Sequence, residues 1–224
     1  DRLKPSSHRA HTLPTSVSVD WGDGSPTSDY QITGSGAASD VAIGPKSHTY
    51  DDGPNDYTVT VTVSDPNGGS DSKTFNVHVN NVAPTATLSN DSPVDEGSPS
   101  TISFSDQSDP SNADTTAGFH YAYSCSNGDL SGSTYAGSGT AATTSCTFDD
   151  GPSDHTVKAR ILDKDGGFSE YTTSVHVNNV APTATLGNNG PVDESSPATV
   201  SFTGQSDPSN ADTAAGFRYE YNCD

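Results

Sequence analysis

The residues of this chain best suited to chemistry are oxygen-bearing side chains gathered in short turns. Carboxylate and amide groups recur in the segments VDEG (94–97), DDGPSD (149–154), VNNV (177–180) and DPSNAD (207–212). Hard oxygen ligands of this kind suit Ca²⁺. The alternative is that these residues only form turns, because Asp, Asn and Gly dominate turns without any ion. If calcium binds at a junction between domains, the candidate ligands are Glu96, Asp149, Asp150, Asn178, Asn179, Asp207 and Asp212.

Catalytic chemistry has little support in the sequence. No Gly-x-Ser-x-Gly, His-Glu-x-x-His or P-loop motif occurs, and the seven histidines are scattered. The neighbouring carboxylates Asp51 and Asp52, and likewise Asp95 and Glu96, could mimic an acid–base pair. Each pair lies in a turn that repeats along the chain, which indicates a structural role. The sequence therefore predicts no enzyme and no cofactor other than calcium at domain junctions.

The charge of the chain excludes several kinds of partner. Nine Lys and Arg residues stand against 29 Asp and Glu, which gives a formal net charge of −20. Such a surface repels phosphate backbones and anionic lipid, so we expect no nucleic-acid partner. No apolar run is long enough to span a membrane, and no secretory signal begins at Asp1. Methionine is absent, including at position 1, so we expect a processed product or a window of a longer polypeptide.

A long internal repeat organises the chain. The string NNVAPTATL begins at Asn80 and again at Asn178, an offset of 98 (178 − 80 = 98), and Cys125 matches Cys223 at the same offset. A period near one hundred residues is that of a whole small domain. The repeat predicts the later part of one domain preceded by a non-repeat segment (1–80), a complete domain (81–178) and the early part of a third (179–224).

Within the period, apolar residues alternate with polar ones. In YTVTVTVSD (57–65) the residues at 57, 59, 61 and 63 are Tyr or Val, and apolar residues alternate in the same way in the segments 102–104, 119–123 and 157–161. Period-two alternation with one polar face is typical of half-buried antiparallel strands. No stretch has a sustained helical period. About seven strands in 98 residues predict an all-β fold of tandem immunoglobulin-like sandwiches, one complete and two partial.

Four motifs of the first copy resemble a known family. They are VDWGDGS (19–25), SHTYDDG (47–53), YTVTVTVSD (57–65) and VNNVAPT (79–85), and they are similar to the polycystic kidney disease (PKD) domain found in tandem in bacterial and archaeal surface proteins. In the second copy CSNGDLSG and SCTFDDG replace the first two motifs, so membership of the later copies rests on the repeat. The resemblance implies an extracellular, immunoglobulin-like spacer or adhesion module without catalytic residues.

The three cysteines bear on localisation. Cys125 and Cys146 stand where the first copy has Trp21 and His48, in phase with inward-facing aromatic residues. This placement predicts a disulfide, with two buried free thiols as the alternative, and a disulfide would indicate an oxidising, extracellular or cell-surface setting. Cys223 is the copy of Cys125, so its partner is expected 21 residues further on (146 − 125 = 21), outside this chain.

The function that these features favour is mechanical: a stalk, fibre or filamentous surface appendage. The two partial copies are roughly complementary, so the partners are either further repeats of a longer array or copies of the chain joined head to tail by strand complementation. Against complementation, both partial copies contain the central strand of the sandwich.

The competing interpretation is a polysaccharide- or protein-binding accessory or adhesion module. It requires aromatic side chains exposed on one sheet face, whereas the tyrosines here have an inward phase and the chain has a single Trp. Attached glycans are a further expectation, because Asn90-Asp-Ser is a glycosylation sequon.

Overall fold

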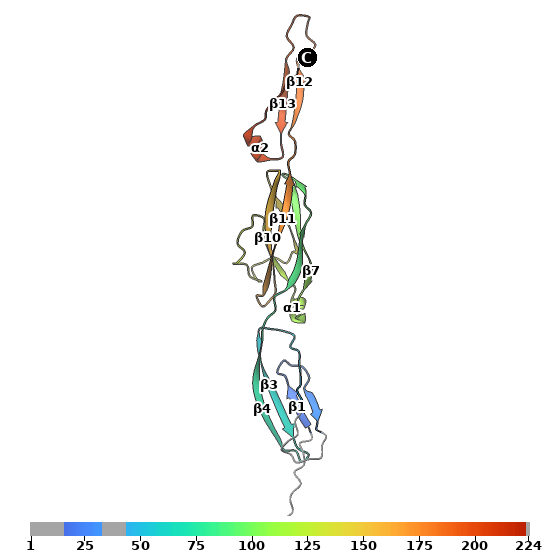
Figure 1. Ribbon diagram of the computed structural model, residues 1–224, viewed down its shortest axis with the longest axis vertical. Coiled ribbons are helices and arrows are strands. Elements are labelled where there is room, and N and C mark those ends of the chain that lie inside the picture. Colours follow the sequence, from blue (N-terminus) through green and yellow to red (C-terminus); the bar gives the residue numbers. More distant parts are fainter. Residues whose placement is uncertain (1–15, 33–43, 223–224) are drawn as a thin grey trace, which may run out of the picture. The chain divides into compact units, whose positions relative to one another are not determined.

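The computed structural model describes residues 16–32 and 44–222 (Figure 1). The chain divides into two compact units. Unit 1 comprises Asp1–Val82 with Ser111–Ala113, and unit 2 comprises Ala83–Pro110 with Asp114–Asp224. Within unit 2 we distinguish a central module, which ends at residue 178, and a C-terminal module, residues 179–222.

The central module is a sandwich of two sheets. One sheet has the order β6-β11-β10-β8 and the other β5-β7-β9. Neighbouring strands are antiparallel, except that β6 runs parallel to β11. The strands are β5 (Thr85–Asn90), β6 (Val94–Asp95), β7 (Pro99–Ser108), β8 (His120–Ser124), β9 (Thr143–Thr147), β10 (Ser153–Leu162) and β11 (Phe168–Asn178).

The core of the central module lies between these two sheets, because each sheet turns its alternate apolar side chains inward. Ile102 of β7 packs in one buried cluster with Val157 of β10 and Val175 of β11. Phe104 of β7 packs in a second cluster with Ile161 of β10. The alternate apolar residues of these strands are therefore buried between the sheets, as the sequence predicts. The all-β, immunoglobulin-like sandwich is confirmed for this module.

Unit 1 contains a single described sheet, of order β2-β1-β3-β4. Val17, Val19 and Trp21 pack with Val59 in its buried core. Within residues 16–32 and 44–82 no second sheet covers the rest of the inner face, and Phe75 is 53% exposed there. The strands are β1 (Ser16–Asp20), β2 (Ser28–Gln31), β3 (Asn55–Ser64) and β4 (Ser70–Val79).

The C-terminal module repeats the early strands of the central module. It consists of the strands β12 (Thr183–Asn188) and β13 (Val200–Ser206) and the helix α2 (Asn210–Ala215), which lies at the end of β13 (Figure 1). Val200 is 42% exposed, whereas Ile102, its counterpart 98 residues earlier, is fully buried. The difference arises because no second sheet packs against β12 and β13 among the described residues.

Two short helices were not predicted from the sequence. They are α1 (Asn112–Ala117) and α2, each of six residues. Six residues are too few for a helical period to stand out, and local capping defines the helix instead. The Ser209 side chain accepts a hydrogen bond from the Asp212 backbone N–H, and Gly216 ends the helix with a φ of 82°. Among the described residues, neither helix nor any other has the length and apolar character needed to span a membrane.

Candidate metal centre

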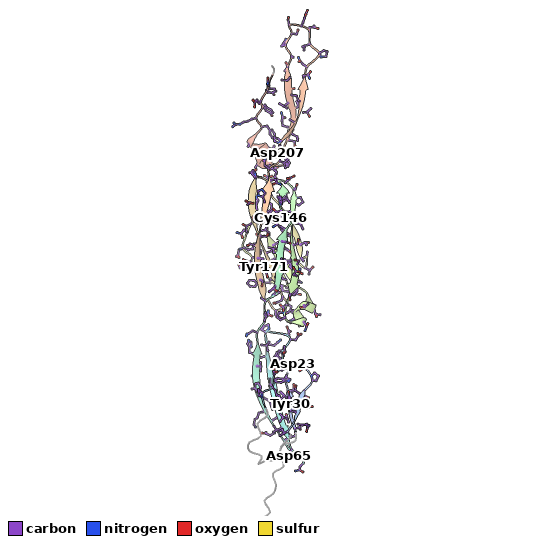
Figure 2. The ribbon with its side chains drawn as sticks, turned by 45° about the vertical axis from the view of Figure 1, so that its right-hand side comes forward. Asp23, Tyr30, Asp65, Cys146, Tyr171 and Asp207 are labelled. Atoms are coloured by element: carbon purple, nitrogen blue, oxygen red, sulfur yellow. A yellow bond between two sulfur atoms is a disulfide. The ribbon has the colours of Figure 1, made fainter. Side chains whose placement is uncertain are left out.

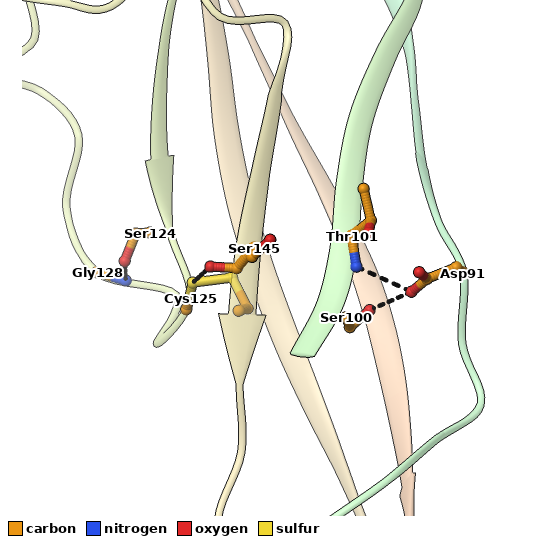
Figure 3. Close-up of a disulfide and its surroundings, with 8 residues drawn as sticks. Asp91, Ser100, Thr101, Ser124, Cys125, Gly128 and Ser145 are labelled. Carbon is orange, nitrogen blue, oxygen red and sulfur yellow. Dashed lines mark hydrogen bonds between the residues drawn. A yellow bond between two sulfur atoms is a disulfide. The ribbon is translucent and has the colours of Figure 1, made fainter. Parts of the chain in front are cut away.

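The two sheets of the central module are joined by the disulfide that the sequence predicts. Cys125, directly after β8, is bonded to Cys146 of β9, with a Cα–Cα distance of 5.6 Å (Figure 3). In unit 1 the equivalent positions hold Trp21 and His48, whose rings are stacked with centroids 4.8 Å apart. The same two positions of the repeat are therefore joined by a covalent bond in the central module and by an aromatic contact in unit 1. The predicted pairing of Cys223 falls outside the described residues.

The aromatic pair of unit 1 continues into a polar network. His48 Nε2 lies 2.6 Å from Asp23 Oδ2, and the Ser25 hydroxyl donates to Asp23 Oδ1 over 2.5 Å. The hydrogen bond from Ser25, followed by that from His48, lowers the pKa of Asp23 to about 2. Asp23 therefore stays ionised at neutral pH and acts as the acceptor that fixes the His48 ring against Trp21.

Three of the seven predicted calcium ligands meet in unit 2. One carboxylate oxygen from each of Glu96, Asp207 and Asp212 lies within 4.8 Å of the others. Glu96 follows β6 of the central module, Asp207 follows β13, and Asp212 belongs to α2. Figure 2 labels Asp207 at the place where the C-terminal module joins the central one. We call these three residues the junction cluster.

The electrostatics of the junction cluster favour a cation. Desolvation raises the pKa of Asp212, and the charges of Asp150, Asp207, Glu96 and Asp149 raise it further. Asp207 Oδ2 is buried and has no hydrogen-bond partner among the described residues. Oxygen ligands around one calcium ion lie 2.3–2.6 Å from it, so pairs of ligands can be up to about 5 Å apart. The spacing, the orphaned oxygen and the excess negative charge all fit calcium.

The other predicted ligands are used in different ways. Asp149 Oδ1 accepts hydrogen bonds of 2.9 and 2.8 Å from the backbone and side-chain amides of Asn210, at the start of α2. These bonds, the backbone one first, lower the pKa of Asp149. The Asn178 side chain donates to Asp95 Oδ1 over 3.2 Å, and Asn179 is exposed. Asp149 and Asn178 thus hold the backbone around the junction cluster and are not part of it.

Glu96 combines both roles, because it is 1% exposed and ties two segments together. Its Oε2 accepts from the Gly151 backbone N–H over 2.8 Å, and its Oε1 accepts from the Val180 backbone N–H over 2.8 Å. The first bond reaches the turn before β10, and the second reaches the segment that leads into β12. Each oxygen keeps a further lone pair, so the carboxylate is positioned by the fold and remains able to bind a metal.

A second acidic cluster was not predicted. Carboxylate oxygens of Asp109, Asp114 and Asp163 lie within 4.8 Å of one another in the central module. Two of these residues stand 98 positions before Asp207 and Asp212, since 207 − 109 and 212 − 114 both equal 98. Subtracting the repeat offset of 98 from the positions of the predicted ligands Asp207 and Asp212 would have identified Asp109 and Asp114 from the sequence. The central and C-terminal modules therefore carry the same pair of aspartates, one before the short helix and one within it.

Asp163 also stabilises the turn between β10 and β11. Its Oδ1 accepts hydrogen bonds from the backbone N–H groups of Asp165 and Gly167, at 2.9 and 2.8 Å. Lys164, the next residue, places its Nζ 3.3 Å from a carboxylate oxygen of Asp114. A lysine thus supplies part of the positive charge that these buried carboxylates require.

The glycosylation sequon is engaged in the fold of the central module. The Asn90 side-chain amide donates to Thr173 Oγ1 over 2.7 Å and to the Ser174 carbonyl over 3.0 Å. Its Oδ1 accepts from the Ser92 backbone N–H over 2.8 Å. A glycan on this nitrogen would replace one of the two donated hydrogens, so attachment would cost a bond between β5 and β11. Glycosylation at Asn90 stays a prediction.

The described residues define an all-β protein built from immunoglobulin-like sandwich modules, one of them complete and disulfide-bonded. The chain matches no family model and no curated protein. Among solved structures it is similar to the fibronectin(III)-like modules of Clostridium thermocellum CbhA, at 16% sequence identity and a TM-score of 0.29, with 79% of this chain and 82% of that chain covered.

Proposed function

We propose that this chain is a structural repeat protein of the PKD type, located at the cell surface or in the extracellular space as part of a stalk, fibre or filamentous appendage. The observation that carries the proposal is the repeated template. One period of 98 residues recurs along the chain, and the same core position is secured by a disulfide in one copy and by stacked rings in another. Covalent disulfides persist in oxidising compartments, which supports the location.

The proposed role is to resist extension and requires no catalytic residue. In both units the longest hairpin is paired along ten residues, β3 with β4 and β10 with β11. Backbone hydrogen bonds in such a ladder must break together when the strands are pulled apart. In the central module the disulfide also limits how far the chain between β8 and β9 can lengthen.

The exposed aromatic side chains give less support to a binding module. Phe75, Tyr219 and Tyr221 lie on the inner faces of the partial sandwiches. Phe168 lies under the Arg160 guanidinium, 4.1 Å from its ring centroid. No outer aromatic platform for polysaccharide is present among residues 16–32 and 44–222. Retention of the chain on chitin, cellulose or collagen would nevertheless favour the binding module.

Electron microscopy of the native material tests the structural proposal directly. We expect immunogold labelling with an antibody against the central module to decorate extended surface structures at regular intervals. Labelling confined to the cell interior, or to globular secreted complexes that retain polymer, would count against a stalk or fibre. Single-molecule extension of the chain adds a second test, because the disulfide should shorten the length released when the central module unfolds.

We further propose that calcium stabilises the junction cluster. Thermal unfolding should shift to higher temperature in calcium relative to chelator, because the ion offsets the repulsion around Asp212. The variant Asp212→Asn should remove the calcium response and should raise the midpoint in chelator, where the repulsion is uncompensated. Asp193→Asn, an exposed aspartate of the same module, is the matched control and should keep the response. An unchanged midpoint in calcium would remove the proposal.

A further inference from the structure

Three Asn-Gly pairs occur in the chain, at 67–68, 127–128 and 189–190. In such a pair the backbone nitrogen of the glycine can attack the side-chain carbonyl carbon of the asparagine, because glycine has no Cβ to hinder the approach. The nitrogen loses its proton to solvent, the side-chain amide leaves as ammonia, and a five-membered succinimide forms. Water then opens the ring to aspartate or isoaspartate, so the net reaction consumes water and releases ammonia.

Asn67 lies between β3 and β4 in residues 65–69, which we call the β3–β4 turn (Figure 2 labels Asp65). Asp65 Oδ1 fixes the backbone of this turn by accepting from the N–H groups of Asn67 and Gly69, both over 2.8 Å. The side chain of Asn67 is exposed and makes no hydrogen bond with any described residue. The carbon that would be attacked is therefore free to turn towards Gly68.

The reacting nitrogen of this pair is also accessible. The Gly68 N–H donates to the Asp65 carbonyl over 3.3 Å, beyond the usual range for such a bond. Outside the neighbouring residues, no atom lies within 4 Å of the position that a Cβ on Gly68 would take. The nitrogen is weakly held, and there is open space for a ring to form.

The Asn127 pair differs because its glycine nitrogen is engaged. The Gly128 N–H donates to Ser124 Oγ over 2.7 Å (Figure 3). The same oxygen lies 2.9 Å from the position that a Cβ on Gly128 would take, so the space around this glycine is filled. Ser124 ends β8, and Cys125 beside it is bonded to Cys146, so the fold fixes this contact. The nitrogen must give up its hydrogen bond before it can attack.

The Asn189 pair is held at both reacting groups. Asn189 Oδ1 accepts from the Thr199 backbone N–H over 2.7 Å, which fixes the side chain. The Gly190 N–H donates to Asn188 Oδ1 over 2.8 Å, which fixes the nitrogen. The same dipeptide thus stands in three settings, and only at Asn67 are the carbon and the nitrogen both available.

We propose that Asn67 is the modification site of the folded chain, where it deamidates well ahead of Asn127 and Asn189. The reaction needs only water and is separate from the proposed structural function. It adds a negative charge to a chain whose formal net charge is −20. It also alters the turn that closes the long pairing of β3 with β4.

The central module shows which product the β3–β4 turn tolerates. Asp165 occupies the position equivalent to Asn67, since 165 − 67 = 98. Its backbone N–H donates to Asp163 Oδ1 over 2.9 Å, as that of Asn67 does to Asp65. An ordinary aspartate therefore fits this turn. Isoaspartate adds a methylene to the backbone, which moves the N–H groups that Asp65 accepts, so this product should weaken the hairpin.

Mass spectrometry of the 224-residue chain tests the proposal. The chain, with Cys223→Ser, is kept at mildly alkaline pH and then digested, and fragmentation assigns each conversion of amide to carboxyl. We expect Asn67 to react about tenfold or more faster than Asn127 and Asn189, because each of these must first lose a hydrogen bond. In guanidinium chloride after reduction, the three should react at similar rates, because each is followed by glycine.

A pair of serine variants tests the cause of the protection. Ser124→Ala removes the acceptor of the Gly128 N–H and should speed the reaction of Asn127 about tenfold. Ser126→Ala is the matched control in the same loop, because the exposed Ser126 makes no hydrogen bond with the described residues. It should leave the rate at Asn127 unchanged. Unaltered far-UV circular dichroism would show that both variants are folded.

Urea unfolding followed by Trp21 fluorescence tests the consequence for unit 1. An aged chain should contain a fraction that unfolds at lower urea, equal to the fraction of isoaspartate measured with an isoaspartate-specific methyltransferase. The variant Asn67→Asp carries the new charge without the extra methylene and should unfold with the parent chain.

Three results would overturn the proposal. The first is an intact Asn67 in the folded chain under conditions where the denatured chain reacts. The second is modification of Asn127 or Asn189 in the folded chain as fast as that of Asn67. The third is an unchanged rate at Asn127 in the folded Ser124→Ala variant, which would show that the hydrogen bond to Gly128 gives no protection.

Discussion

Removal of the Cys125–Cys146 disulfide should destabilise the central module and leave unit 1 unaffected. The two cysteines are 21 residues apart, and closing a loop of that length reduces the entropy of the unfolded chain by an amount worth about 3 kcal/mol. Replacing both by alanine removes this constraint from the unfolded state. The folded sandwich keeps its other core residues, so the loss should appear in stability and not in secondary structure.

Two spectroscopic signals separate the units in one experiment. Trp21 is the single Trp of the chain and is 8% exposed in the core of unit 1, so its fluorescence follows unit 1 alone. Far-UV circular dichroism follows the strands of both units. With a urea dependence of about 2 kcal/mol/M, a loss of about 3 kcal/mol lowers the midpoint of the central module by about 1.5 M.

The control is the parent chain with Cys223→Ser, oxidised and then reduced, because reduction should reproduce the double alanine variant. The reasoning is refuted if the circular dichroism transition does not move. It is also refuted if the fluorescence transition moves by the same amount, since the disulfide would then act on the whole chain and not on one module.

Three further predictions concern charge and burial. The pKa of Asp23 is lowered from 3.8 to about 2, so the ionised carboxylate stabilises unit 1 fully above about pH 4, and this stabilisation is lost as the pH falls towards 2. The variant Asp23→Asn should remove this part of the acid unfolding transition, followed by Trp21 fluorescence. The pKa of Asp212 is raised, so in chelator the C-terminal module should become more stable as the pH falls through that value, measured by slower hydrogen exchange in α2, and Asp212→Asn should abolish this change. Ile102→Ala should cost about 2–5 kcal/mol in urea unfolding, whereas Val200→Ala, at the equivalent but exposed position, should cost less than about 0.5 kcal/mol.

Much of the fold could be read from local pattern. Alternation in 57–65 and 157–161 predicts strands because side chains of a strand point to opposite faces, whatever lies beyond them. The disulfide was predictable because the 98-residue offset aligns Cys125 and Cys146 with a pair of residues already in phase with the core. The helix α2 was not, because its existence depends on a cap at Ser209 and not on a periodic apolar face.

The candidate metal centre could be predicted only as a set of residue types. Glu96 is more than a hundred residues from Asp207 and Asp212, and only folding brings their oxygens within 4.8 Å. Asp149 belongs to the same acidic turns, yet its carboxylate is committed to the amides of Asn210. Hydrogen-bond geometry in the folded chain decides which carboxylate binds an amide and which remains available for a metal. The spacing of the residues in the sequence does not contain this geometry.

The sequence by itself determined the repeating template, the strand phases and the cysteine pair, because each follows from residues compared at fixed offsets. Only the tertiary structure decided which inward-phase residues are buried. Ile102 and Val200 occupy the same position of the template, but Ile102 is covered by a second sheet and Val200 is not. A side chain is buried only when a second surface covers it, so burial cannot be predicted from the sequence of one strand alone.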